Sequence, residues 1–94
     1  MSTGEDRTVI IADDGRYVTL GRYSQPSEDE LQAARDALAK QGIGAWLATM
    51  HGTFYQRRAP KLTMIRELVP PRVTWDAAVA AFKAAHKASL ANLA

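Results

Sequence analysis

The segment of the chain best suited to binding chemistry is residues 54–61 (FYQRRAPK). Two adjacent aromatic residues stand there close to three basic ones. Aromatic rings stack on nucleic-acid bases, and guanidinium groups bind phosphate through a fork of donors. We therefore expect this segment to contact an anionic macromolecule, nucleic acid or an acidic protein, through Tyr55, Arg57, Arg58 and Lys61. Three further basic residues extend the predicted surface: Arg72, Lys83 and Lys87.

The distribution of charge favours the same hypothesis. The 94 residues carry a formal net charge of +2, but residues 1–36 hold eight acidic and four basic residues, whereas residues 37–94 hold two acidic and eight basic ones. Such asymmetry favours an anionic partner or head-to-tail self-association. The alternative is that residues 54–61 form a solvated basic loop with one core aromatic residue and one at its rim.

Nucleophilic catalysis has little support in the sequence. The chain has four serines and two histidines, and it lacks the Gly-x-Ser-x-Gly motif that presents a serine nucleophile. Ser27 is explained as a helix cap, and Glu28 and Glu30 belong to the same capping pattern. Because no reactive residue is left without a structural explanation, we expect no enzymatic activity.

Metal and cofactor sites are also poorly supported. The chain has no cysteine, so a zinc site would need both histidines and help from carboxylates. His51 is expected in a turn, and His86 on the apolar stripe of a helix. Residues 42–44 (GIG) follow a predicted helix instead of opening one, so they do not form a phosphate-binding loop. We expect no cofactor and no metal ion.

A β-hairpin is predicted near the N-terminus. The β-branched run 8–12 is followed by the pair Asp14-Gly15 and by residues 17–20 (YVTL), which is typical of a two-residue turn. This turn would pair Ile11 with Val18 and place both on the core face together with Val9 and Leu20. The opposite face would carry Ile10, Tyr17 and Thr19.

Two helices and two further strands are predicted after the hairpin. Ser27 and Glu30 form a capping box, and Gly42 is the left-handed residue that ends the helix. Residues 44–50 and 62–69 are apolar runs typical of strands. Thr74 caps a last helix, along which the larger residues Trp75, Val79, Phe82 and His86 recur at three- and four-residue spacing.

This order predicts a single α+β domain over residues 1–94, with residues 1–6 as a flexible tail. We expect a two-layer sandwich in which two helices cover one face of an antiparallel or mixed sheet of about four strands. No apolar run is long enough for a membrane span, and the polar N-terminus does not resemble a secretory signal. We therefore expect a cytoplasmic protein without a membrane partner.

The favoured function is that of a small bacterial interaction protein that presents a basic surface to nucleic acid or a nucleoprotein. One alternative is an inhibitor or adaptor that binds a protein by steric occlusion, for example against host defence, through Ile10, Tyr17 and Tyr23 on the open side of the hairpin. Another is a homodimer whose seam is the last helix or an open sheet edge. Partner, oligomeric state and strand order are not determined by the sequence.

Overall fold

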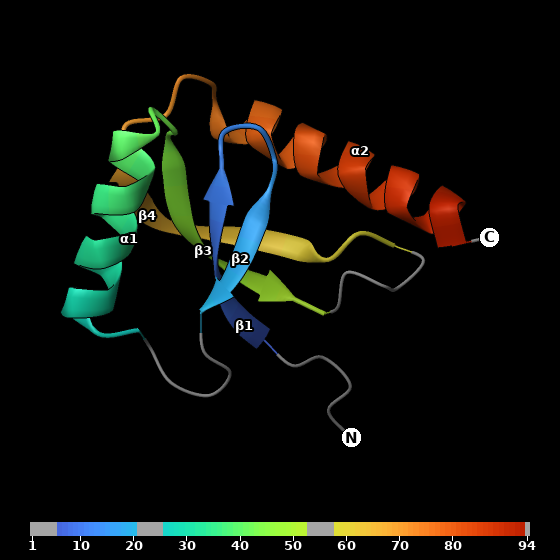
Figure 1. The fold of residues 1–94 in the computed structure, drawn as a ribbon. Helices are drawn as coiled ribbons and strands as arrows, with labels where there is room; N and C mark the ends of the chain where they lie inside the picture. Colours follow the sequence, from blue (N-terminus) through green and yellow to red (C-terminus); the bar gives the residue numbers. More distant parts are fainter. Residues whose placement is uncertain (1–5, 21–25, 53–57, 94) are drawn as a thin grey trace.

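The computed structural model describes residues 6–20, 26–52 and 58–93, and Figure 1 shows how their helices and strands are arranged. The α+β class and the order of elements predicted from the sequence are confirmed. The elements along the chain are β1 (Asp6–Ala12), β2 (Tyr17–Leu20), α1 (Glu28–Lys40), β3 (Ala45–His51), β4 (Lys61–Val69) and α2 (Trp75–Leu93).

The four strands form one antiparallel sheet in the order β2-β1-β3-β4. The central strands β1 and β3 are buried in nearly continuous runs, residues 9–12 and 45–48. Consecutive residues of a strand are all buried when both faces of the sheet are covered, because successive side chains point to opposite faces. No helix among the described residues is long and apolar enough to cross a membrane.

The two helices cover opposite faces of the sheet, so the prediction that both lie on one face is wrong. Val9 and Ile11 belong to a cluster with Phe82 of α2. Ile10, which lies between them, belongs to a second cluster with Leu31 of α1. The molecule therefore has three layers, because the apolar runs in β1 and β3 need cover on both sides.

The register of the hairpin also differs from the prediction by one residue. Ile11 pairs with Tyr17, and Val18 pairs with Ile10. The loop has three residues, closed by a hydrogen bond from the Ala12 amide to the Arg16 carbonyl (2.8 Å), and Gly15 at its end has φ +90°. A turn followed by a left-handed glycine is the usual three-residue hairpin loop.

A shift of one residue moves every side chain of β2 to the other face. Tyr17 consequently lies on the α2 side, where its ring meets the edge of Phe82 at a centroid distance of 5.6 Å. Val18 lies on the α1 side and is 55% exposed. The predicted shared surface of Ile10, Tyr17 and Tyr23 is thus wrong for its first two members, and Tyr23 lies outside the described residues.

Helix α1 begins and ends as predicted. Ser27 Oγ accepts a hydrogen bond from the Glu30 amide (3.1 Å), and the Glu30 carboxylate accepts from the Ser27 amide. At the other end Gly42 has φ +70°, and the Ile43 amide donates to the Leu38 carbonyl (3.0 Å). These bonds form a Schellman motif, which satisfies the last carbonyls of the helix.

Helix α2 begins after Thr74, whose hydroxyl accepts from the Ala77 amide (3.1 Å). Phe82 and His86 of the predicted stripe are buried, and Trp75 and Val79 are half-buried. Ala78, which does not belong to the predicted stripe, is buried as well. Trp75 meets Trp46 of β3 edge to face at 5.4 Å. This aromatic pair fixes the N-terminal end of α2 on the sheet.

Candidate anion-binding surface

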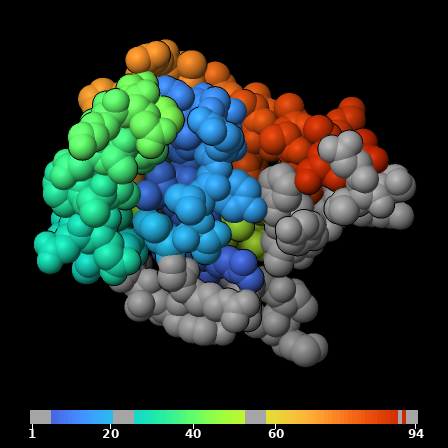
Figure 2. Space-filling model, in the orientation of Figure 1, coloured from blue at the N-terminus to red at the C-terminus, as the bar shows by residue number. Residues whose placement is uncertain are grey.

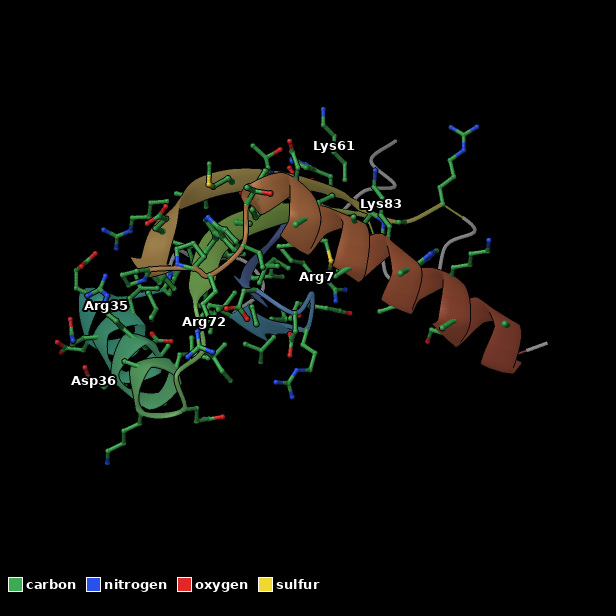
Figure 3. The ribbon with its side chains drawn as sticks, turned by 90° about the horizontal axis from the view of Figure 1, so that it is seen from above. Arg7, Arg35, Asp36, Lys61, Arg72 and Lys83 are labelled. Atoms are coloured by element: carbon green, nitrogen blue, oxygen red, sulfur yellow. The ribbon has the colours of Figure 1, made fainter. Side chains whose placement is uncertain are left out.

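Four of the seven predicted contact residues lie away from α1, near the start of β4 and along α2. Arg58 precedes β4 and Lys61 is its first residue, and both side chains are exposed. Lys83 and Lys87 are also exposed, and they stand one turn apart on α2. Figures 1 and 3 place the start of β4 and the middle of α2 on the side of the molecule away from α1. We refer to Arg58, Lys61, Lys83 and Lys87 together as the basic surface, which extends around the edge of the sheet: Lys61 pairs with His51 on the face that α1 covers, whereas Lys83 and Lys87 lie on α2, which covers the other face.

The other three predicted residues are not part of this set. Tyr55 and Arg57 lie outside the described residues. Arg72 is exposed, but it lies beside α1 and far from Lys61 and Lys83 in Figure 3. One of its guanidinium nitrogens is 3.1 Å from where a Cβ of Gly42 would lie. The prediction that Arg72 supports the same surface is therefore not favoured by its position.

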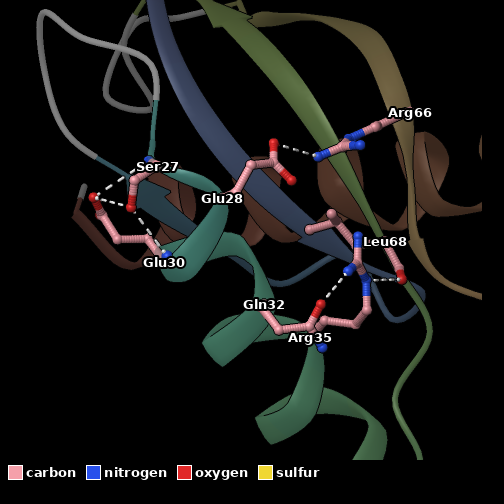
Figure 4. A network of polar contacts seen from close by, with 7 residues as sticks. All are labelled: Ser27, Glu28, Glu30, Gln32, Arg35, Arg66 and Leu68. Atoms are coloured by element: carbon pink, nitrogen blue, oxygen red, sulfur yellow. Dashed lines mark hydrogen bonds and ion pairs between the residues drawn. The ribbon is translucent and has the colours of Figure 1, made fainter.

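The members of the basic surface make no ion pair within the part of the chain that the structure describes. Two other basic residues do form ion pairs: Arg16 with Asp14 (2.7 Å) and Arg66 with Glu28 (3.4 Å). The Arg35 guanidinium donates to the Leu68 carbonyl (3.0 Å) and to Gln32 (2.6 Å), which links α1 to β4 (Figure 4). No near neighbour among the described residues therefore neutralises the charge of the basic surface.

The acidic residues of the N-terminal half are mostly engaged within the fold. Asp13 accepts from the Gly44 amide (3.2 Å), Glu30 caps α1, and Asp36 accepts from the Gln32 amide group (2.9 Å). Many of the acidic side chains therefore serve turns, caps and ion pairs, whereas the four members of the basic surface, like Lys40 and Arg72, make no ion pair within the described residues.

A polar row next to Lys61 could not be foreseen from the sequence. His51 lies opposite both Asp6 of β1 and Lys61 of β4 in the sheet. Its Nδ1 is 3.0 Å from Asp6 Oδ1, and its Nε2 is 3.0 Å from the Thr63 hydroxyl. The expectations that His51 lies in a turn and that Asp6 belongs to a flexible tail are therefore wrong. These residues come from three strands that are far apart in the sequence, so no local spacing pattern predicts that they meet.

The polar row is not arranged as a metal site. Both ring nitrogens of His51 already have hydrogen-bonding partners, and its side chain is 38% exposed. No cluster of three or more metal-ligating side chains occurs among the described residues. What the row offers chemically is a set of polar groups beside the Lys61 ammonium.

The pKa of the Asp14 carboxyl is lowered from its ordinary value. The main cause is the Arg16 backbone amide, which donates to Asp14 Oδ1 (3.0 Å). The Arg16 side chain adds a second hydrogen bond and a favourable charge, and slight burial acts in the opposite direction. Hydrogen bonds to the ionised form favour that form, so the turn holds Asp14 as a carboxylate.

A groove lies between α1 and β2, on the part of the α1 side of the sheet that the helix does not cover. It has a volume of about 360 Å³. Its lining is mainly apolar and includes Ile10, Val18, Ala37 and Leu38, with Arg16 at its edge. Figure 2 shows α1 in green and β2 in light blue on either side of it. The alanines on this face of α1 leave the space that larger side chains would fill.

No protein-family model matches the chain, and no curated protein or solved structure is significantly similar to it.

Proposed function

We propose that the protein is a non-enzymatic module that binds the phosphate backbone of nucleic acid through the basic surface. The observation that carries this proposal is that Arg58, Lys61, Lys83 and Lys87 are exposed and have no ion pair within the described residues. Cations that are not neutralised inside a protein remain available to displace counterions from a polyanion.

The sequence next to Arg58 favours nucleic acid over an acidic protein. Arg57 directly precedes it and Tyr55 lies three residues before it, and aromatic rings near arginines provide base stacking as well as phosphate contacts. Nucleic acid is therefore the partner for which both residue types have a use.

A salt titration tests this proposal. Fluorescence anisotropy of the full chain with labelled 20-mer single-stranded and duplex DNA and RNA would be measured over a range of KCl concentrations. Four phosphate contacts on duplex DNA predict a log–log slope of about −3.6. The double variant Lys83→Ala, Lys87→Ala should make the slope shallower by about 2.

Matched controls separate this surface from charge in general. Lys40→Ala removes an exposed lysine from α1, away from the basic surface, and should leave the slope unchanged. All variants should keep the wild-type melting temperature, because exposed charges contribute little to folding. Binding that is independent of salt, or an equal loss in the Lys40 variant, would contradict the proposal. Tighter binding to poly-glutamate than to DNA would identify an acidic protein as the partner.

A further inference from the structure

We infer that the groove between α1 and β2 binds the extended, apolar C-terminal tail of a protein partner, which adds to the sheet as a fifth strand beside β2. This interaction would be separate from the basic surface and does not depend on the proposed nucleic-acid binding. Three features carry the inference: a strand edge that pairs with no other described strand, an apolar groove next to it, and guanidinium groups at one end.

The open edge is that of β2. Within the described residues β2 pairs only with β1, because the strand order is β2-β1-β3-β4. The Ala12 amide donates to the Arg16 carbonyl, so the backbone of Arg16 is bonded to β1. In an antiparallel pair every second residue bonds to the partner strand, so the backbone of Val18 also bonds to β1. The backbone N–H and C=O of Thr19 therefore point away from the sheet, where an added strand would pair with them.

The groove supplies the side-chain contact. Val18 is 55% exposed on the α1 side, and it lines the groove together with Ile10, Ala37 and Leu38. In an added strand, the residue opposite Val18 points to the same face of the sheet. An apolar side chain at that position would lie over Val18 and face the groove wall formed by α1.

Charge at one end of the groove fixes the direction of the tail. The groove ends beside the β1–β2 loop, at Arg16 and Gln41. Among the described residues only the Nε of Arg16 is bound, by Asp14, and the side chain is 74% exposed, so its terminal nitrogens can still donate. The Arg72 side chain lies beside Gly42, and the two chain neighbours of Gly42, Gln41 and Ile43, both line the groove.

A strand antiparallel to β2 would end at this cationic side, because β2 starts there. The group that arrives beside Arg16 would be the free C-terminal carboxylate, which guanidinium binds in a two-pronged geometry. Asp14 binds the Arg16 Nε, but the two terminal nitrogens of Arg16 and the nearby Arg72 leave donors for a carboxylate at this end, which favours a C-terminal tail over an internal segment of a partner.

The test uses a defined peptide and the full-length chain. The probe is an N-acetylated six-residue peptide that alternates threonine with valine and ends in a valine carboxylate; the same peptide with a C-terminal amide is the comparison. Binding is followed by ¹⁵N NMR shifts and by hydrogen exchange of the Thr19 amide. The free acid should bind saturably, slow Thr19 exchange, and bind at least about tenfold more tightly than the amide.

Variants test each feature separately. Thr19→Pro removes the outward N–H without touching a bond to β1, and should weaken binding about fivefold or more, whereas Thr19→Ala should not. Ala37→Leu narrows the groove and should weaken binding too. Ala33→Leu, the same change on an exposed part of α1 that does not line the groove, is its control. If Thr19→Pro unfolds the protein, the comparison of Ala37→Leu with Ala33→Leu still tests the inference.

Several results would overturn the inference. Absence of saturable binding, equal binding of acid and amide, or equal effects of Ala37→Leu and Ala33→Leu would each do so. Binding of dodecanoate that is sensitive to Ala37→Leu but not to Thr19→Pro would assign the groove to a fatty acid. Dimerisation by light scattering that Thr19→Pro abolishes would assign the edge to a second copy of this chain.

Discussion

Gly15, at the end of the β1–β2 loop, is packed against the backbone of Phe82 in α2. A Cβ built on Gly15 would lie 2.7 Å from the Phe82 backbone nitrogen, and Gly15 has φ +90°. The loop therefore needs glycine for two reasons, its left-handed backbone and the close approach of the helix. This contact ties the hairpin to the helix on the far side from α1.

Gly15→Ala should destabilise the protein by at least about 2 kcal/mol, because left-handed strain and overpacking against backbone add. Urea unfolding of the variant measures the loss. Gly42→Ala is the matched control, since Gly42 has φ +70° but its Cβ would meet only the end of the flexible Arg72 side chain. The control should cost about 1 kcal/mol. Equal losses at the two positions would show that the Gly15 contact is not tight.

Ser27→Ala should lower the free energy of unfolding by about 1 kcal/mol, because the Glu30 amide loses its acceptor at the start of α1. Thermal unfolding followed by circular dichroism detects the change. Ser27→Asp keeps a side-chain acceptor and should retain most of the stability. A loss in Ser27→Asp as large as that in Ser27→Ala would mean that the cap does not stabilise the helix.

Arg35→Ala should lower the free energy of unfolding by about 1–2 kcal/mol. In the ladder between β3 and β4, Ala45 pairs with Val69 and the next residue, Trp46, pairs with Glu67. Leu68 therefore has no partner in β3 and is the extra residue of a β-bulge. Its carbonyl accepts from Arg35 Nε, and the variant leaves this carbonyl without that donor. Lys40→Ala, at an exposed position of the same helix, should change stability by less than about 0.5 kcal/mol. Urea titrations of the two variants compare them directly.

The lowered pKa of Asp14 predicts a contribution to stability that depends on pH. This contribution is fully present above the pKa of an unfolded aspartate and is lost as the pH falls through the lower folded value. Because the Asp14 side chain is 47% exposed, solvent keeps the contribution small. ¹³C NMR titration of the Asp14 carboxyl measures its pKa.

Arg16→Ala tests the cause of this pKa. The largest cause is the Arg16 backbone amide, which alanine retains. The variant should therefore keep part of the lowering of the Asp14 pKa. A full return to the ordinary value would assign the effect to the guanidinium instead.

Local patterns predicted the elements well. The capping box at Ser27, the Schellman motif at Gly42 and the cap at Thr74 all involve residues at most five apart. Such bonds form within a single turn, so their residues can be found in the sequence without knowledge of the fold. The same holds for the exposure of Arg58, Lys61, Lys83 and Lys87, because charged side chains seldom tolerate burial.

The sequence by itself determined the element types, the ends of α1, the start of α2 and the surplus of bases in its second half. Only the tertiary structure decided the hairpin register, the placement of α1 and α2 on opposite faces, and the meeting of Asp6, His51 and Thr63. It also decided that Arg72 lies beside α1, apart from the other bases. The physical reason is range: caps and turns depend on neighbours along the chain, whereas layers and ladders depend on which distant surfaces bury one another.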